Sequence, residues 1–228
     1  MKRLISSCNT SAPECPDSGE WADVARALEA LEHQPPSQLA DHGCDCCRGA
    51  RGWFQATARA MACLDSATPR WIRERWQWGP QEWPLWWCQA VERDQIDCGA
   101  FAALTREAFA ATGQRTVSVQ LIERFDARTV DNWMARWSGE AHTSWLFGKF
   151  CYHEAVGLVT VLQINSHRQS LRIWDPVDTC WVEHRHVAGY GSVVACRVLP
   201  ASPACRDEAA EYDWRGHMLQ VGCWHVLG

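Results

Sequence analysis

The chain has 228 residues, of which 47% are hydrophobic, so it can bury one sizeable core without a second domain. Its net charge is -5, and its lysines and arginines are scattered along the sequence. It also has no run of about 18 apolar residues. We therefore expect neither a nucleic-acid partner nor a membrane partner.

Thirteen cysteines are a high count for a chain of this length. The first residues, MKRLISSCNTSAPECPDSG, lack the apolar core of a secretion signal. We therefore expect a cytoplasmic protein in which most thiols are reduced and serve as small buried hydrophobes.

Fifteen tryptophans are the second unusual feature, and seven of them fall between Trp53 and Trp87. Two interpretations remain open: the rings fill a core, or they line a substrate groove.

The first half of the chain is predicted to be mainly helical. WADVARALEALE has apolar residues at helical spacing, and CGAFAALTREAFAAT combines strong helix formers with a glycine at position 113 to end the helix. The predicted segments are a loose leader over 1–19, helices over 21–32, 53–65 and 98–112, a loop over 34–52 and a Trp- and Pro-rich connector over 66–87.

The second half is predicted to be mainly strands. TVSVQLIERF alternates and is β-branched, as a strand is. The predicted segments are strands over 116–125, 153–164, 170–175, 180–187, 192–199 and 218–227, a helix over 127–139 and a hairpin loop over 166–169. This order predicts a single α+β domain over 1–228, with a mainly helical lobe over 20–115 and a mainly β lobe over 116–228.

Cys98 is the predicted nucleophile because it stands at the start of the Ala-rich helix. A helix N-terminus offers free N–H groups and a positive partial charge, and both stabilise a thiolate. The backbone N–H of Cys98 can also donate to an oxyanion, and Gly99 leaves room for a substrate in the groove.

A thiolate of this kind needs a base and an orienting partner for that base. His153 stands at the head of a predicted strand, and Asp175 ends the strand that follows. An antiparallel hairpin would bring the two side chains together, so we predict His153 as base and Asp175 as its orienting carboxylate.

The motifs DCGAFAAL, YHEAVGL and IWDPVD, in this order, resemble the papain-like cysteine peptidase clan. Within this clan, the chain is most similar to the peptidase C39-like and bacterial transglutaminase-like groups, over roughly residues 85–200. The resemblance implies a papain-like fold and a catalytic triad of Cys98, His153 and Asp175, with no cofactor.

The sequence departs from that clan at the oxyanion donor. Papain-like enzymes usually carry a glutamine six residues before the cysteine, where this chain has Glu92. A carboxylate repels an oxyanion, so the second donor stays open among Gln95, Gln89 and Trp87. Trp86 and Trp174 are further candidates for the substrate groove.

Two other groups of histidine and cysteine residues are weaker candidates for a functional site. His42, Cys44, Cys46 and Cys47 are weak candidates for a zinc site, because their spacing matches paired C-x-x-C motifs poorly. His184 and His186 alternate on a predicted strand, where solvent exposure is a simpler explanation than metal binding.

The resemblance implies acyl transfer through a thioester intermediate. Because the domain stands alone and is rich in tryptophan, we expect amide-bond formation or hydrolysis on a small-molecule, peptide or carrier-protein-bound acyl substrate in a biosynthetic pathway. The alternatives are a peptidase or amidase, an inactive papain-like binding module, and a zinc-stabilised interaction protein built around 42–47. The oligomeric state stays open.

Overall fold

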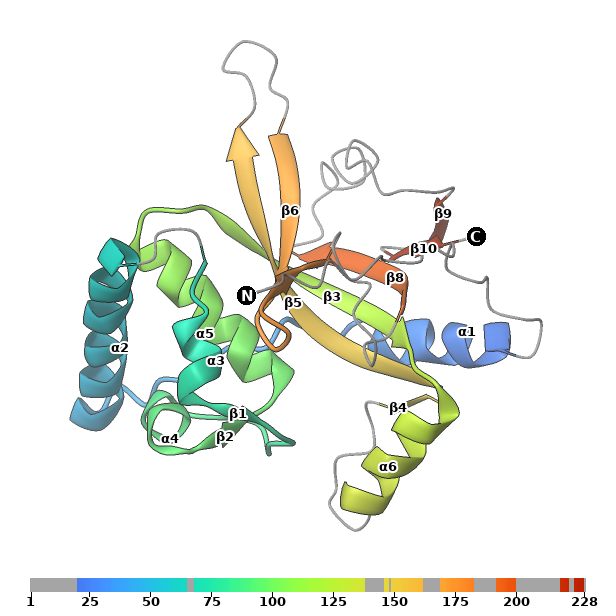
Figure 1. Cartoon of the computed structure of the whole chain (residues 1–228), viewed down its shortest axis with the longest axis horizontal. Coiled ribbons are helices and arrows are strands. Elements are labelled where there is room, and N and C mark those ends of the chain that lie inside the picture. Colours follow the sequence, from blue (N-terminus) through green and yellow to red (C-terminus); the bar gives the residue numbers. More distant parts are fainter. Residues whose placement is uncertain are drawn as a thin grey trace, which may run out of the picture.

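The computed structural model describes residues 20–64, 68–137, 146–147, 149–161, 169–182, 192–199, 218–221 and 224–227. Its helices are α1 (Glu20–Leu31), α2 (Asp45–Leu64), α3 (Trp71–Arg75), α4 (Trp87–Glu92), α5 (Cys98–Ala111) and α6 (Ala127–Trp137). Helices α2 to α5 gather on one side of the molecule, beside an antiparallel sheet (Figure 1). This mixture of helix and antiparallel sheet agrees with the predicted α+β class.

The described strands form two sheets. The first pairs β1 (Gln77–Trp78) with β2 (Gln95–Ile96) in parallel. The second has the order β7-β6-β5-β3-β8-β10-β9, with β4 beside β5, and its pairs are antiparallel. Its members are β3 (Thr116–Arg124), β4 (Leu146–Phe147), β5 (Phe150–Val161), β6 (Gln169–Asp175), β7 (Cys180–Trp181), β8 (Ser192–Leu199), β9 (Met218–Val221) and β10 (Trp224–Leu227).

Helices α2 to α5 share one hydrophobic core. Its buried members include one large side chain from each helix: Phe54, Ile72, Trp87 and Phe101. Trp76 is fully buried among them, and its indole Nε1 donates to the Ala90 carbonyl at 2.9 Å. That bond satisfies the polar atom of the ring, so a large aromatic side chain can be buried without a desolvation penalty.

A segment that we call the strap, residues 32–38, crosses between α1 and the helical lobe. Arg197 of β8 holds its beginning by donating to the carbonyl oxygens of Leu31 and Gln34, each at 2.8 Å, and to that of Glu32. Gln120 of β3 accepts from Arg197 Nε at 2.9 Å. A guanidinium at the C-terminal end of α1 satisfies carbonyls that the helix leaves unpaired and complements the helix dipole.

The predicted loop over 34–52 is wrong in its second half, because α2 begins at Asp45 rather than at residue 53. Cys47, Phe54 and Ala58 form its buried stripe, at spacings close to whole helical turns. Gly49 and Gly52 lie on exposed sides of the helix. Tertiary packing of that stripe outweighs the loop-like local composition.

The predicted connector over 66–87 contains α3 and β1, and it ends at the first residue of α4. Strand β5 begins at Phe150, three residues before the predicted start, so His153 lies inside the strand. The predicted strand over 218–227 is two strands, β9 and β10, paired with each other. The leader over 1–19, the end of the strand predicted over 180–187 and most of the loop predicted over 166–169 lie outside the described residues.

None of the described helices combines the length and the apolar character that a membrane span needs.

We expect Arg197→Ala to destabilise the fold by about 3 kcal/mol, because it removes a buried guanidinium that donates to the carbonyl oxygens of Leu31, Glu32 and Gln34 and leaves its partner Gln120 without that donor. Urea unfolding followed by tryptophan fluorescence measures the free energy of unfolding. Arg59→Ala, which removes an exposed arginine from α2, is the matched control and should change it by less than about 0.5 kcal/mol. Equal stability of the two variants would contradict the role given to Arg197.

Candidate active site

His153 and Asp175 come together because β5 and β6 pair antiparallel. Their register places Val156 opposite Trp174, so Asp175 lies on the same face of the sheet as His153 and diagonal to it. His153 Nε2 and Asp175 Oδ2 are 2.9 Å apart, and both side chains are almost fully buried. The predicted contact between these two residues is therefore confirmed.

Asp175 is held rigidly by the turn that follows it. Its Oδ1 accepts from the backbone amides of Val177 at 2.8 Å and Asp178 at 3.2 Å, which leaves Oδ2 for the imidazole. The fully buried carboxylate thus has partners on both oxygens. It fixes the ring of His153 with Nε2 toward the aspartate, so Nδ1 is the nitrogen left for another partner.

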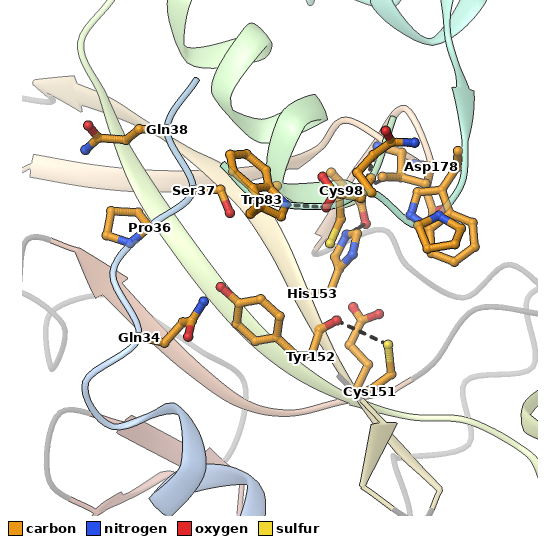
Figure 2. Close-up of a pocket in the computed structure, with 18 of the residues that line it drawn as sticks. Gln34, Pro36, Ser37, Gln38, Trp83, Cys98, Cys151, Tyr152, His153 and Asp178 are labelled. Carbon is orange, nitrogen blue, oxygen red and sulfur yellow. Dashed lines mark hydrogen bonds and ion pairs between the residues drawn. The ribbon is translucent and has the colours of Figure 1, made fainter. Parts of the chain in front are cut away.

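Cys98 is that partner. It is the first residue of α5, as predicted, and its side chain hydrogen bonds to His153. Figure 2 shows the Cys98 sulfur against the imidazole ring. The helix start is set by Asp97, whose Oδ1 accepts from the Ala100 amide at 2.8 Å, while its Oδ2 accepts from Trp83 Nε1 at 2.6 Å.

The charge state of His153 follows from this neighbourhood. Burial alone lowers the pKa of a histidine, but the hydrogen bond and negative charge of Cys98 outweigh burial and raise the pKa of His153 to about 9. The charge of Asp178 acts in the same direction. The imidazolium form of His153 is therefore favoured beside the Cys98 sulfur.

A second cysteine, Cys151, lies on the same pocket wall. Burial raises the pKa of its thiol far above the ordinary value, although the nearby charge of His153 lowers it in part. Cys151 therefore stays a neutral thiol near neutral pH.

Cys98, His153 and Asp175 open onto a pocket of about 950 Å³ between the strap, the segment before α4 and the sheet. A volume of this order matches the pockets that bind small molecules. Figure 2 shows four strap residues on one wall of the pocket, namely Gln34, Pro36, Ser37 and Gln38. It also shows Trp83 close to Cys98. The remaining aromatic and proline lining includes Trp78, Pro80 and Pro84.

The strap is anchored at the pocket by a buried carboxylate. Glu154 of β5 accepts from the Ser37 hydroxyl at 2.7 Å, from the Ser37 amide at 3.1 Å and from the Tyr152 hydroxyl at 2.6 Å. Arg106 of α5 donates to the Ser37 carbonyl. Burial lowers the pKa of Arg106, and the neighbouring charge of Glu154 opposes that shift.

Gly99 is needed where the strap meets α5. A Cβ at this position would lie 2.3 Å from Ser37 Oγ and 2.7 Å from Ser37 Cβ. Gly99 lines the pocket, but the nearest neighbour of a Cβ there would be the chain's own strap, so its role in a substrate groove stays a prediction.

The other predicted site residues lie elsewhere. Gln95 Nε2 donates to the Trp78 carbonyl at 3.2 Å, and Gln89 Oε1 accepts from the Trp86 amide at 3.2 Å as part of the start of α4. Trp87 and Trp174 are buried in hydrophobic clusters, and Trp86 stacks on His42. None of Gln95, Gln89, Trp87, Trp86 and Trp174 lines the described pocket.

Both interpretations of the tryptophans hold in part. Most of those between 53 and 87 fill or flank the helical core, while Trp78 and Trp83 line the pocket. Sequence reasoning missed Trp83 and Asp178, because only the folded chain brings them to Cys98 and His153. The aspartate before Cys98 carried a usable signal, since Asp is a preferred N-cap residue. His184 and His186 lie outside the described residues.

Comparison with protein-family models finds no match to this chain, and comparison with curated proteins finds no relative.

We expect Cys98→Ser to lower the pKa of His153 from about 9, because the variant removes the hydrogen bond and the charge of Cys98, which are the largest contributions that oppose burial. Titration of the His153 ring by NMR measures this shift. Cys63→Ser, at an exposed cysteine of α2, should leave the titration unchanged. A pKa that stays near 9 in Cys98→Ser would contradict the thiolate–imidazolium pair.

We expect Gly99→Ala to destabilise the fold by roughly 1–3 kcal/mol and to loosen the strap, because the new methyl group collides with Ser37. Gly52→Ala in α2 is the matched control: its Cβ meets nothing within 4 Å, so helix propensity should stabilise that variant by up to about 1 kcal/mol. Thermal or urea unfolding of both variants gives the comparison. A stabilised Gly99→Ala would show that the contact with Ser37 is not tight.

Proposed function

We propose that the chain catalyses acyl transfer through a thioester on Cys98. The observation that carries the proposal is the chain of contacts from Asp175 to His153 to Cys98 at the N-terminus of α5, at the edge of a pocket of about 950 Å³. The resemblance of the three motifs to papain-like and transglutaminase-like enzymes supports the same chemistry.

In the first step the Cys98 thiolate attacks the acyl carbon of the substrate. The carbonyl π electrons move onto oxygen, and the bond to the leaving group then breaks as His153 Nδ1–H gives that group its proton. The product is an acyl thioester on Cys98 and a neutral imidazole. Asp175 keeps the ring oriented and stabilises its charged form without taking the proton.

In the second step an acceptor cleaves the thioester. The neutral His153 takes a proton from water or from an amine, the acceptor attacks the acyl carbon, and the Cys98 thiolate leaves. Water gives an acid and therefore hydrolysis, whereas an amine gives an amide. The tryptophan- and proline-lined wall supports the second outcome, since aminolysis depends on keeping water out.

The oxyanion of each step needs two donors. The Cys98 amide, free at the first turn of α5, is one of them. Of the pocket amides, Gln34 and Gln38 are drawn well away from Cys98 in Figure 2, so Gln81 is the remaining side-chain amide of the lining and our candidate for the second donor. Arg93 binds its Oε1, which leaves the Nε2 group as the donor.

We expect Cys98 to be acylated by p-nitrophenyl acetate, a general acyl donor, with an acetyl adduct seen by intact-protein mass spectrometry and mapped to Cys98. The His153→Ala variant should acylate about 100-fold more slowly, because the thiolate loses its imidazolium partner. Cys63→Ser serves as control and should react like the unmodified protein.

Adding a primary amine to the acylated protein distinguishes the two acceptors, since amide product means aminolysis and acetate means hydrolysis.

Limiting iodoacetamide between about pH 5 and pH 9 should likewise modify Cys98 ahead of the exposed thiols at neutral pH and below. If Cys98 stays unmodified while exposed cysteines react, the chain is a binding module on this scaffold and the proposal is wrong.

A further inference from the structure

Four cysteines outside the pocket converge on one point between α2 and α4. The Sγ atoms of Cys44 and Cys46 are 2.7 Å apart, and those of Cys47 and Cys88 are 3.6 Å apart. The side chain of Cys46 also hydrogen bonds to that of Cys88, and the side chain of Cys44 to that of Cys47. The ligand atoms of Cys44, Cys46 and Cys47 all lie within 4.8 Å of one another, and Cys88 joins this group through its contact with Cys47, 41 residues away in sequence.

We propose that Cys44, Cys46, Cys47 and Cys88 form a tetrathiolate zinc site. Four thiolates in tetrahedral array are the usual ligand set of structural zinc. With zinc–sulfur bonds of about 2.3 Å, neighbouring sulfurs of such a site lie about 3.8 Å apart. The Cys47–Cys88 distance is close to this edge, and the exposed side chain of Cys46 has room to turn away from Cys44.

The structure changes the ligand set that the spacing suggested. His42 drops out because its ring stacks on Trp86. Cys88, at the second position of α4, takes its place. The resulting ligand set consists of four thiolates, which are soft ligands and favour zinc over the hard cations magnesium and calcium.

Backbone amides lie against two of the four sulfurs. The Cys47 amide, in the first turn of α2, donates to Cys44 Sγ at 3.4 Å, and the amides of His42 and Cys88 face the Cys47 sulfur. Backbone N–H groups of this kind commonly support metal-bound sulfur. Cys47 is fully buried while Cys46 is exposed, so the site has one closed side and one entry path.

A zinc ion here would reinforce an existing backbone connection. The Ala40 amide donates to the Leu85 carbonyl at 2.8 Å, and the Trp87 amide donates to the Ala40 carbonyl at 3.1 Å. These hydrogen bonds join two segments that lead into the pocket wall. The strap ends shortly before Ala40, and the pocket residues Trp83 and Pro84 come directly before Leu85. The metal would therefore clamp two walls of the pocket from behind.

The test is the metal content of the full chain, purified under reducing conditions without chelator and measured by elemental mass spectrometry. We expect about one zinc per chain, and its binding to release protons as the thiols ionise. Cys88→Ser should lose most of the zinc, and so should Cys46→Ser, whose exposed position makes misfolding a poor explanation for the loss. Cys63→Ser on the same helix and Cys98→Ser at the pocket should keep it.

Cobalt provides a second readout that does not depend on the variants. Adding Co²⁺ to the chelator-treated protein should give the sulfur-to-metal charge-transfer and intense visible bands of a tetrahedral thiolate site, which zinc then removes. The proposal is overturned if the folded protein takes up no zinc and shows no such bands. It is equally overturned if Cys88→Ser binds as much zinc as the unmodified chain.

Discussion

The buried carboxylate of Glu154 is the constraint on which the site's shape depends. It is fully buried between the sheet and the strap, where an ionised group is tolerated only if hydrogen bonds replace the lost water. Ser37 and Tyr152 supply those bonds, and Arg106 reaches the Ser37 carbonyl from α5. One carboxylate thus ties together the strap and the strand that carries the proposed base.

This tie has a geometric consequence for the nucleophile. Because Ser37 is held at Glu154, the first turn of α5 must approach it closely, and only a residue without a Cβ fits at position 99. The neighbouring Cys98 is then presented at a fixed distance from β5. Catalytic geometry of this kind is set by packing around the reacting groups as much as by the groups themselves.

Helix-forming composition and strand alternation located Cys98–Ala111 and Thr116–Arg124 well, although both elements are buried at long runs of consecutive positions rather than along one face. Composition failed as a guide at Asp45, where glycines and cysteines imitate a loop and only tertiary packing makes a helix. In the site, chain order was enough to pair His153 with Asp175, because adjacent antiparallel strands bring their ends together. Distance in sequence did not identify the amide that donates to the oxyanion. Gln95 and Gln89 are close to Cys98 in sequence, but their side chains hydrogen bond to backbone groups of the helical lobe instead.

The cysteines show how far surroundings, rather than residue type, decide chemistry in this chain. Cys151 is buried beside His153, and the cost of desolvating its thiolate keeps it neutral. Cys98 stands at a helix N-terminus within reach of the same imidazole. In the cluster around Cys47 the sulfurs have one another and backbone amides as neighbours, with no described imidazole contact to accept a proton. The zinc site that we propose there would give the cluster a structural task, separate from the chemical task that we propose for Cys98.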